Sequence, residues 1–166
     1  MNWDAVSALA DWLGVILIVV SLIYLARQIQ QNTNTIKSAT ELETGRMWSE
    51  LHARMAHSEN MVDIWDKGLT DADSLTPTEK RKFIWFVAEY FYLVENLYRQ
   101  RKLGFLSLET WSQHEKAVAG LLLYPTLQRW WESGVSPYST EFKAAIDSRR
   151  QELGDAVWSY TPIADI

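Results

Sequence analysis

The sequence predicts an all-α protein in which an N-terminal transmembrane helix continues into a cytoplasmic helical bundle. An apolar run lies near the N-terminus, helix start and stop signals punctuate the rest, and no segment shows the alternation that is typical of strands. The 166 residues are 48% hydrophobic and include nine Trp and no Cys. This composition argues against disorder and excludes disulfides and a cysteine nucleophile. The predicted parts are a transmembrane anchor (1–27), a membrane-proximal helix (28–57) and a cytoplasmic helical domain (58–166).

The first predicted element is a membrane-spanning helix over residues 5–26, which carry Asp11 as their single charge. About 20 apolar residues in a helix cross the roughly 30 Å hydrocarbon core of a bilayer. The uninterrupted apolar part, residues 12–26, is shorter than that, so a buried core helix stays open as the alternative. The membrane is favoured because interfacial aromatic residues and the first basic residue lie at the expected places, at Trp3, Trp12, Tyr24 and Arg27.

The distribution of charge orients this anchor. All 16 Lys and Arg residues lie at Arg27 or later, whereas residues 1–26 carry only Asp4 and Asp11. Positive charge marks the cytoplasmic side of a span, so we expect the N-terminus outside and the C-terminal domain in the cytoplasm. A cleavable signal peptide fits poorly because its first residues would be basic. The formal net charge of −5 also disfavours a nucleic-acid partner.

Small and polar residues follow one face of the anchor at alternating steps of four and three. In lipid, such residues favour helix–helix contact because backbones approach closely and side chains hydrogen-bond. The stripe predicts self-association, and a homo-oligomeric pore with a ring of Asp11 at its outer mouth is the alternative. Asp11 at the headgroup level and a chance arrangement of the other residues are the simpler interpretations. The stripe consists of Ser7, Asp11, Gly14, Ile18, Ser21, Leu25, Gln28 and Asn32.

Local signals place the helices that follow. Residues 28–57 contain no Pro, so the first helix is predicted to continue, with weak points at residues 32–35 and at Gly45. Ser58 is predicted to cap a short helix that ends at Gly68.

A central helix follows, because Thr76–Glu79 forms a capping box with Pro at the first helical position. This helix is predicted to end at Lys102. Its apolar middle, residues 83–97, is unlike a second span because Glu89 lies within it and basic residues flank both ends.

The last helices are marked by Ser and Gly at their ends. Ser107 and Ser139 are predicted N-caps, Pro125 is predicted to stop the helix that Ser107 opens, and Gly154 is predicted to close the last helix. A short helix lies between them over residues 126–133. The remaining tail, residues 155–166, is predicted to dock as a strap.

No template for catalysis or for a cofactor is met by this sequence. His52, His57 and His114 are not spaced for zinc, and none follows a Glu by three residues, as a di-iron bundle requires. Glu89 and Glu95 interrupt an aromatic helix, and as buried carboxylates they could act as acid or base. We favour structural pairing, of Glu95 with Arg99 and of Glu89 with an Arg or Trp of another helix. An enzyme that uses Glu89 or Glu95 stays the minor alternative.

Aromatic residues form a candidate partner surface at Trp111, Trp130 and Trp131. They could form a cage for a cationic ligand. Adjacent residues of a helix point about 100° apart, so we favour core packing for one of Trp130 and Trp131 and exposure for the other.

The sequence resembles a family of bacterial single-pass membrane proteins that carry an apolar helix ending in a Tyr-Leu-Ala-x-Gln-Ile-x-Gln-Asn-Thr run. Here that run covers Tyr24 to Thr33, and matching residues further along are Glu95, Asn96, Leu97, Tyr98, Trp111, Pro125, Trp131 and Phe142. The resemblance covers most of the chain and implies a bacterial membrane protein with a cytoplasmic helical domain. It implies no activity, cofactor or catalytic residue.

The function we expect is that of a membrane-anchored, self-associating scaffold or accessory subunit in a bacterial inner membrane. Its expected partners are the lipid bilayer, further copies of itself, and another membrane or cytoplasmic protein. The alternatives are the Asp11 pore and, less favoured, the enzyme.

Overall fold

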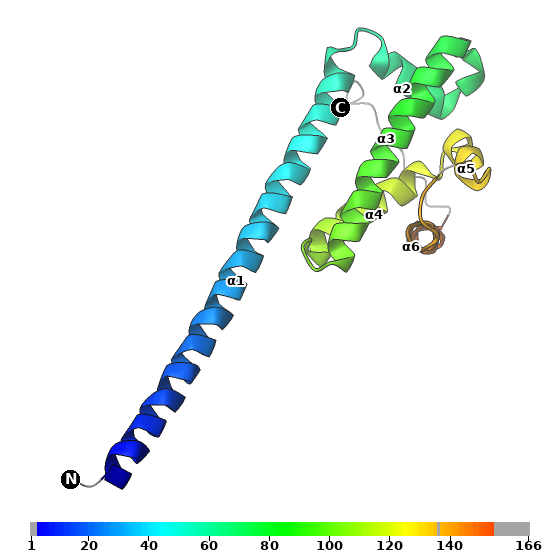
Figure 1. Cartoon of the computed structure of the whole chain (residues 1–166). Coiled ribbons are helices and arrows are strands. Elements are labelled where there is room, and N and C mark those ends of the chain that lie inside the picture. The colour runs from blue at the N-terminus through cyan, green and yellow to red at the C-terminus, as the bar shows by residue number, and fades with distance from the viewer. Residues whose placement is uncertain (1–2, 136, 155–166) are drawn as a thin grey trace. The chain divides into compact units, whose positions relative to one another are not determined.

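A computed structural model describes residues 3–135 and 137–154, and for residues 4–11 it describes the backbone alone. In this part of the chain there are six α-helices, one short 3-10 helix and no strand, which confirms the all-α prediction (Figure 1). The predicted strap, residues 155–166, lies outside the described residues. The elements are α1 (Trp3–His57), α2 (Met61–Thr70), η1 (Ala72–Ser74), α3 (Pro77–Lys102), α4 (Leu108–Leu121), α5 (Pro125–Glu132) and α6 (Thr140–Leu153).

Helix α1 is not interrupted at the predicted weak points. Polar side chains in the weak segment bond within the helix: the hydroxyl of Thr33 donates to the Ile29 carbonyl at 2.9 Å, and that of Thr35 donates to the Gln31 carbonyl at 3.0 Å. Hydroxyls that bond to the preceding turn can be accommodated in a helix without breaking it. The helix therefore continues through residues 32–35, as predicted, and the weak point there does not break it.

The chain forms two compact units, Met1–Glu41 and Leu42–Ile166. The boundary falls inside the predicted membrane-proximal helix, 28–57, because the last turns of α1 pack into the second unit. Leu51 is fully buried, and the ring of Trp48 lies 5.1 Å from that of Tyr90 on α3 and 4.9 Å from that of His114 on α4. Residues 42–57 thus belong to the helical domain.

The N-caps of α3, α4 and α6 match the sequence predictions. The Glu79 N–H donates to the hydroxyl of Thr76 at 3.3 Å, and the Thr76 N–H donates to the Glu79 carboxylate at 2.8 Å, which completes the capping box. The hydroxyls of Ser107 and Ser139 each accept an N–H bond from the first turn of their helix. Such caps satisfy backbone donors that have no partner inside the helix.

The predictions for α2 are wrong at both ends. Asn60 occupies the N-cap position without a side-chain bond, and Ser58 contributes only its carbonyl, which accepts from the Met61 N–H. Gly68 lies within the helix, where a Cβ atom would come 2.3 Å from the ring of Phe83. This glycine therefore permits close packing of α2 on α3.

The core of the second unit is aromatic and joins α3, α5 and α6. The ring of Trp131 lies 5.3 Å from Phe91, 5.8 Å from Tyr138 and 6.1 Å from Phe142. Its indole N–H donates to the Asp147 carboxylate at 2.9 Å. Each aromatic pair of this kind contributes about 0.5–1.5 kcal/mol beyond the area that it buries.

Candidate functional site

The apolar part of α1 is uncovered within the described chain. By length and composition, α1 is the one helix of the described residues that could cross a membrane, and its most apolar 18-residue window has a mean hydropathy of 2.0 with none of it buried. Leu17 is 66% exposed and Trp12 is 70% exposed. Among the described residues of this segment, the side chains are not buried as the alternative of a core helix would require.

The predicted stripe on α1 is described only in part. Ser7 and Asp11 lie where side chains are outside the described residues, so the Asp11 ring of the pore is not examined by the structure. Further along, Ile18, Leu25, Gln28 and Asn32 are exposed, and Ser21 donates its hydroxyl to the Leu17 carbonyl at 2.8 Å. Among the described atoms, none outside the local backbone lies within 4 Å of a Cβ built on Gly14. This face is open along its described length.

Glu89 is held by an arginine of another helix. The guanidinium of Arg54, in the last turn of α1, contacts both carboxylate oxygens of Glu89, at 2.9 and 2.5 Å. Two parallel bonds of this kind fix the orientation of both groups. The prediction that Glu89 pairs with an Arg of another helix is confirmed.

Glu95 is a structural carboxylate. It is 2% exposed, accepts the backbone N–H of Ser139 at 2.8 Å and pairs with Arg99 at 3.2 Å, as the sequence predicted for that pair. Burial alone would raise the pKa of Glu95, but the bonds from Ser139 and Arg99 outweigh burial and hold the pKa below 4.5. A carboxylate that stays ionised with both partners in place is unsuited to proton transfer near neutral pH.

The three histidines do not form a site. His114 stacks on Trp48, with an angle of 14° between the rings, and burial lowers its pKa below 6.5. The ring centroid of His52 lies 5.9 Å from that of Trp48, and the Nδ1 of His57 lies 2.7 Å from the Ala53 carbonyl. In the described residues, no group of three or more His, Cys, Asp or Glu side chains could hold a metal ion.

The predicted partner surface is corrected by the burial of two of its three members. Trp111 is 6% exposed and Trp131 is 1% exposed, because both fill the core beside Tyr98 and Phe91. Trp130 is half-buried and packs against the same core, so the expected core packing of one member of the pair is confirmed and the expected exposure of the other is met only in part.

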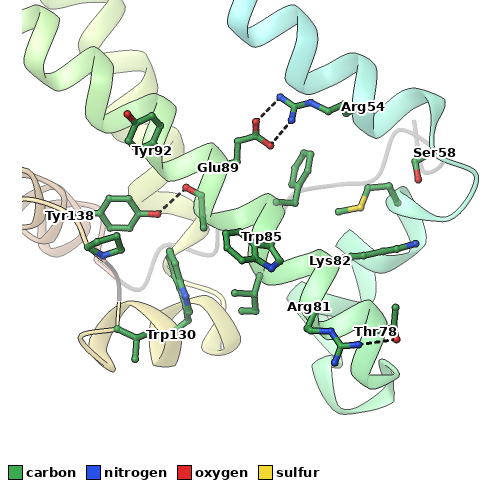
Figure 2. Close-up of a pocket in the computed structure, with 16 residues that line it drawn as sticks. Arg54, Ser58, Thr78, Arg81, Lys82, Trp85, Glu89, Tyr92, Trp130 and Tyr138 are labelled. Carbon is green, nitrogen blue, oxygen red and sulfur yellow. Dashed lines mark hydrogen bonds and ion pairs between the residues drawn. The ribbon is translucent and has the colours of Figure 1, made fainter.

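The second unit also contains a large groove, which we call the aromatic groove. Its volume is about 1000 Å³, and it lies among the end of α1, α2, α3, α5 and the segment before α6 (Figure 2). Apolar and aromatic side chains provide most of its lining, chiefly Met61, Ile84, Trp85, Phe86, Trp130 and Tyr138. Polar and charged side chains complete it, chiefly Arg54, Thr78, Arg81, Lys82, Glu89 and Tyr92.

Helix α3 supplies one wall of the groove through a single face. Steps of three and four residues connect Thr78, Arg81, Trp85, Glu89 and Tyr92, which places them along one side of the helix. The buried side chains of α3 lie on the other side, because Phe83 and Val87 are each two residues, or about 200°, from a member of this row.

Trp85 is 75% exposed in the groove and was not predicted as a site residue. Residues 83–97 form one aromatic run in the sequence, and the run alone does not separate the buried face of α3 from its exposed face. The groove could have been predicted from the row of charged and aromatic residues on α3. The solvent face of a helix that only packs in a core is usually polar, so large aromatic residues on that face indicate a binding surface.

The lining of the groove is suited to binding. Among the described residues that line it, Glu89 is the one carboxylate and is paired with Arg54, and none is a histidine. Pockets of this type, mostly apolar with a few polar groups, are typical ligand sites. Comparisons of the chain with models of protein families, with curated proteins and with solved structures found no match, so the resemblance drawn from the sequence stays a prediction.

Proposed function

We propose that this chain is a single-pass, membrane-anchored helical scaffold or accessory subunit that self-associates through α1. The observation that carries the proposal is the uncovered apolar stretch of α1, with a mean hydropathy of 2.0. Apolar surface in water costs about 25 cal/mol per Å², so a helix of this composition requires a bilayer or further helices around it. Its length is that of a span.

Charge supports one orientation of the anchor. Every Lys and Arg lies at Arg27 or later, so the N-terminus is outside and the helical domain is in the cytoplasm of a bacterial cell. The measurement is labelling of an introduced cysteine, since the chain has no Cys of its own. Lys116→Cys, exposed on α4, should react with a membrane-impermeant maleimide only after the cells are opened. Equal reaction in intact cells would overturn this orientation.

The face that carries Gly14 and Ser21 is where copies of the anchor meet. Small residues allow backbones to approach, and Ser21 has its hydroxyl bonded within its own helix, so it brings no unpaired donor into the contact. Gln28 and Asn32 continue the same face beyond the apolar stretch, where amide side chains can bond between helices.

Cysteine cross-linking in native membranes tests the self-association. Ser21→Cys lies on the proposed contact face, and Ile23→Cys is the matched control because it is at the same depth, about 200° around the helix. Oxidation should give a disulfide-linked dimer with Ser21→Cys and none with Ile23→Cys. Equal cross-linking of both variants, or a monomeric mass for the chain in lipid nanodiscs, would rule out the proposed contact.

A further inference from the structure

We propose that the aromatic groove binds a water-soluble amphiphilic anion, a carboxylate or sulfonate on an aromatic or aliphatic body. This inference goes beyond the proposed function, because anchoring and self-association depend on α1 residues that do not line the groove. The shape, the lining and the charge of the groove all favour such a ligand.

The lining offers flat apolar surfaces to a ligand body. Trp85 and Trp130 come from α3 and α5, and Tyr138 comes from the segment before α6 (Figure 2). Tyr138 is fixed, since its hydroxyl donates to the Ala88 carbonyl at 2.9 Å. The part of the wall that Tyr138 forms is therefore ordered before a ligand binds, which lowers the entropic cost of binding.

The charge of the groove is opposite to that of the chain. Arg54, Arg81 and Lys82 line it together with a single carboxylate, Glu89, whereas the whole chain carries −5. Arg54 is neutralised by its two bonds to Glu89. The excess positive charge therefore lies at Arg81 and Lys82.

Arg81 and Lys82 are available to a ligand. The guanidinium of Arg81 donates to the hydroxyl of Thr78 at 3.3 Å, and within the described residues neither cation has a carboxylate within 4 Å. Both precede Trp85 by about one helical turn, so an anion bound between them would hold its apolar body over the indole ring. This combination selects an anion with an apolar body over a cation or a simple salt ion.

A ligand series with one body and different heads tests the proposal. The full chain is placed in nanodiscs of phosphatidylcholine and titrated by calorimetry with 2-naphthoate and with the neutral 2-naphthamide, and heats from empty discs are subtracted. Naphthoate should bind about tenfold more tightly than the amide, because two cations lie near its carboxylate. Equal affinities would overturn the proposal.

Variants locate the binding in the groove. Arg81→Gln/Lys82→Gln should weaken naphthoate about tenfold and leave the amide unchanged, whereas Trp85→Ala should weaken both ligands about fivefold. The matched charge control is Arg101→Gln/Lys116→Gln, outside the groove, and it should change neither affinity. An equal loss of naphthoate binding in this control would refute the site. An unchanged near-ultraviolet circular dichroism spectrum shows that each variant is folded.

Two further outcomes would assign the groove to another occupant. If naphthoate binds only to a chain that ends at Gly154, the groove belongs to residues 155–166. If anionic lipid in the disc abolishes the difference between naphthoate and its amide at constant ionic strength, the groove is a lipid contact. Either result overturns the proposal and leaves the cross-linking of Ser21→Cys, which tests self-association, unaffected.

Discussion

Removing the carboxylate of Glu95 should separate the start of α6 from α3. Glu95→Ala deletes the acceptor of the Ser139 N–H at 2.8 Å and leaves that donor without its partner in a half-buried place, while Arg99 can turn to water because it is exposed. A hydrogen bond to a charged group contributes about 1.5–3 kcal/mol, and an orphaned buried donor costs about 1–3 kcal/mol. We expect a loss of about 3 kcal/mol.

Glu95→Gln is the matched variant, because it keeps an acceptor at the same place and removes only the charge. Its expected cost is about 1 kcal/mol, the difference between a charged and a neutral acceptor. Urea unfolding of the helical domain, followed by Trp fluorescence with the full chain in nanodiscs, measures both variants. A cost below about 1 kcal/mol for Glu95→Ala would refute the assignment of Glu95 as the tie between the two helices.

The pH dependence gives a second, independent test of Glu95. Its pKa in the folded chain is held below 4.5, so the unfolded chain binds more protons as the pH falls below that value. The stability that Glu95 contributes is therefore complete above about pH 4.5 and is lost as the pH falls through the folded pKa. The difference in unfolding free energy between the parent chain and Glu95→Gln should shrink over this window. A difference that stays constant from pH 6 to pH 3 would contradict this.

Further predictions concern packing, a histidine and a tyrosine. Gly68→Ala should destabilise the domain by about 1–3 kcal/mol in the same urea assay, because its Cβ would overlap the Phe83 ring, and Phe83→Leu should recover part of this loss. His114 should titrate below pH 6.5 by NMR, since burial disfavours its charged form, and domain stability should fall as the pH drops below 6.5; a midpoint at or above 6.5 would contradict its burial. Tyr138→Phe should cost about 1 kcal/mol through the lost hydroxyl bond to α3, and an unchanged unfolding midpoint would show that water replaces the bond.

Features that depend on neighbouring residues could be predicted from the sequence. The capping box at Thr76–Glu79 and the caps at Ser107 and Ser139 follow from side chains that reach backbone groups three residues away. The pairing of Glu95 with Arg99 is of the same kind, one turn apart on a helix.

Features that depend on residues far apart in the sequence could not be predicted. Gly68 has the sequence context of a helix end, and only the position of Phe83 on the next helix shows that it serves close packing. The second partner of Glu95, the N–H of Ser139, lies 44 residues away in sequence. The partner of Glu89, the guanidinium of Arg54, lies 35 residues away. The groove likewise depends on residues far apart in the sequence, because Trp85 on α3 and Trp130 on α5 both line it. Its position follows from tertiary packing and cannot be predicted from a local sequence pattern.

The segment before α6 is tied to α3 at two places, through the Tyr138 hydroxyl at Ala88 and the Ser139 N–H at Glu95. Because Tyr138 lines the groove and Ser139 caps α6, we expect the groove wall to open and α6 to fray in one cooperative event. A ligand present at 100 times its Kd stabilises the closed form by about 2.7 kcal/mol. Backbone amides of α6 would then exchange with solvent about a hundredfold more slowly when the groove is filled, although α6 itself does not line it.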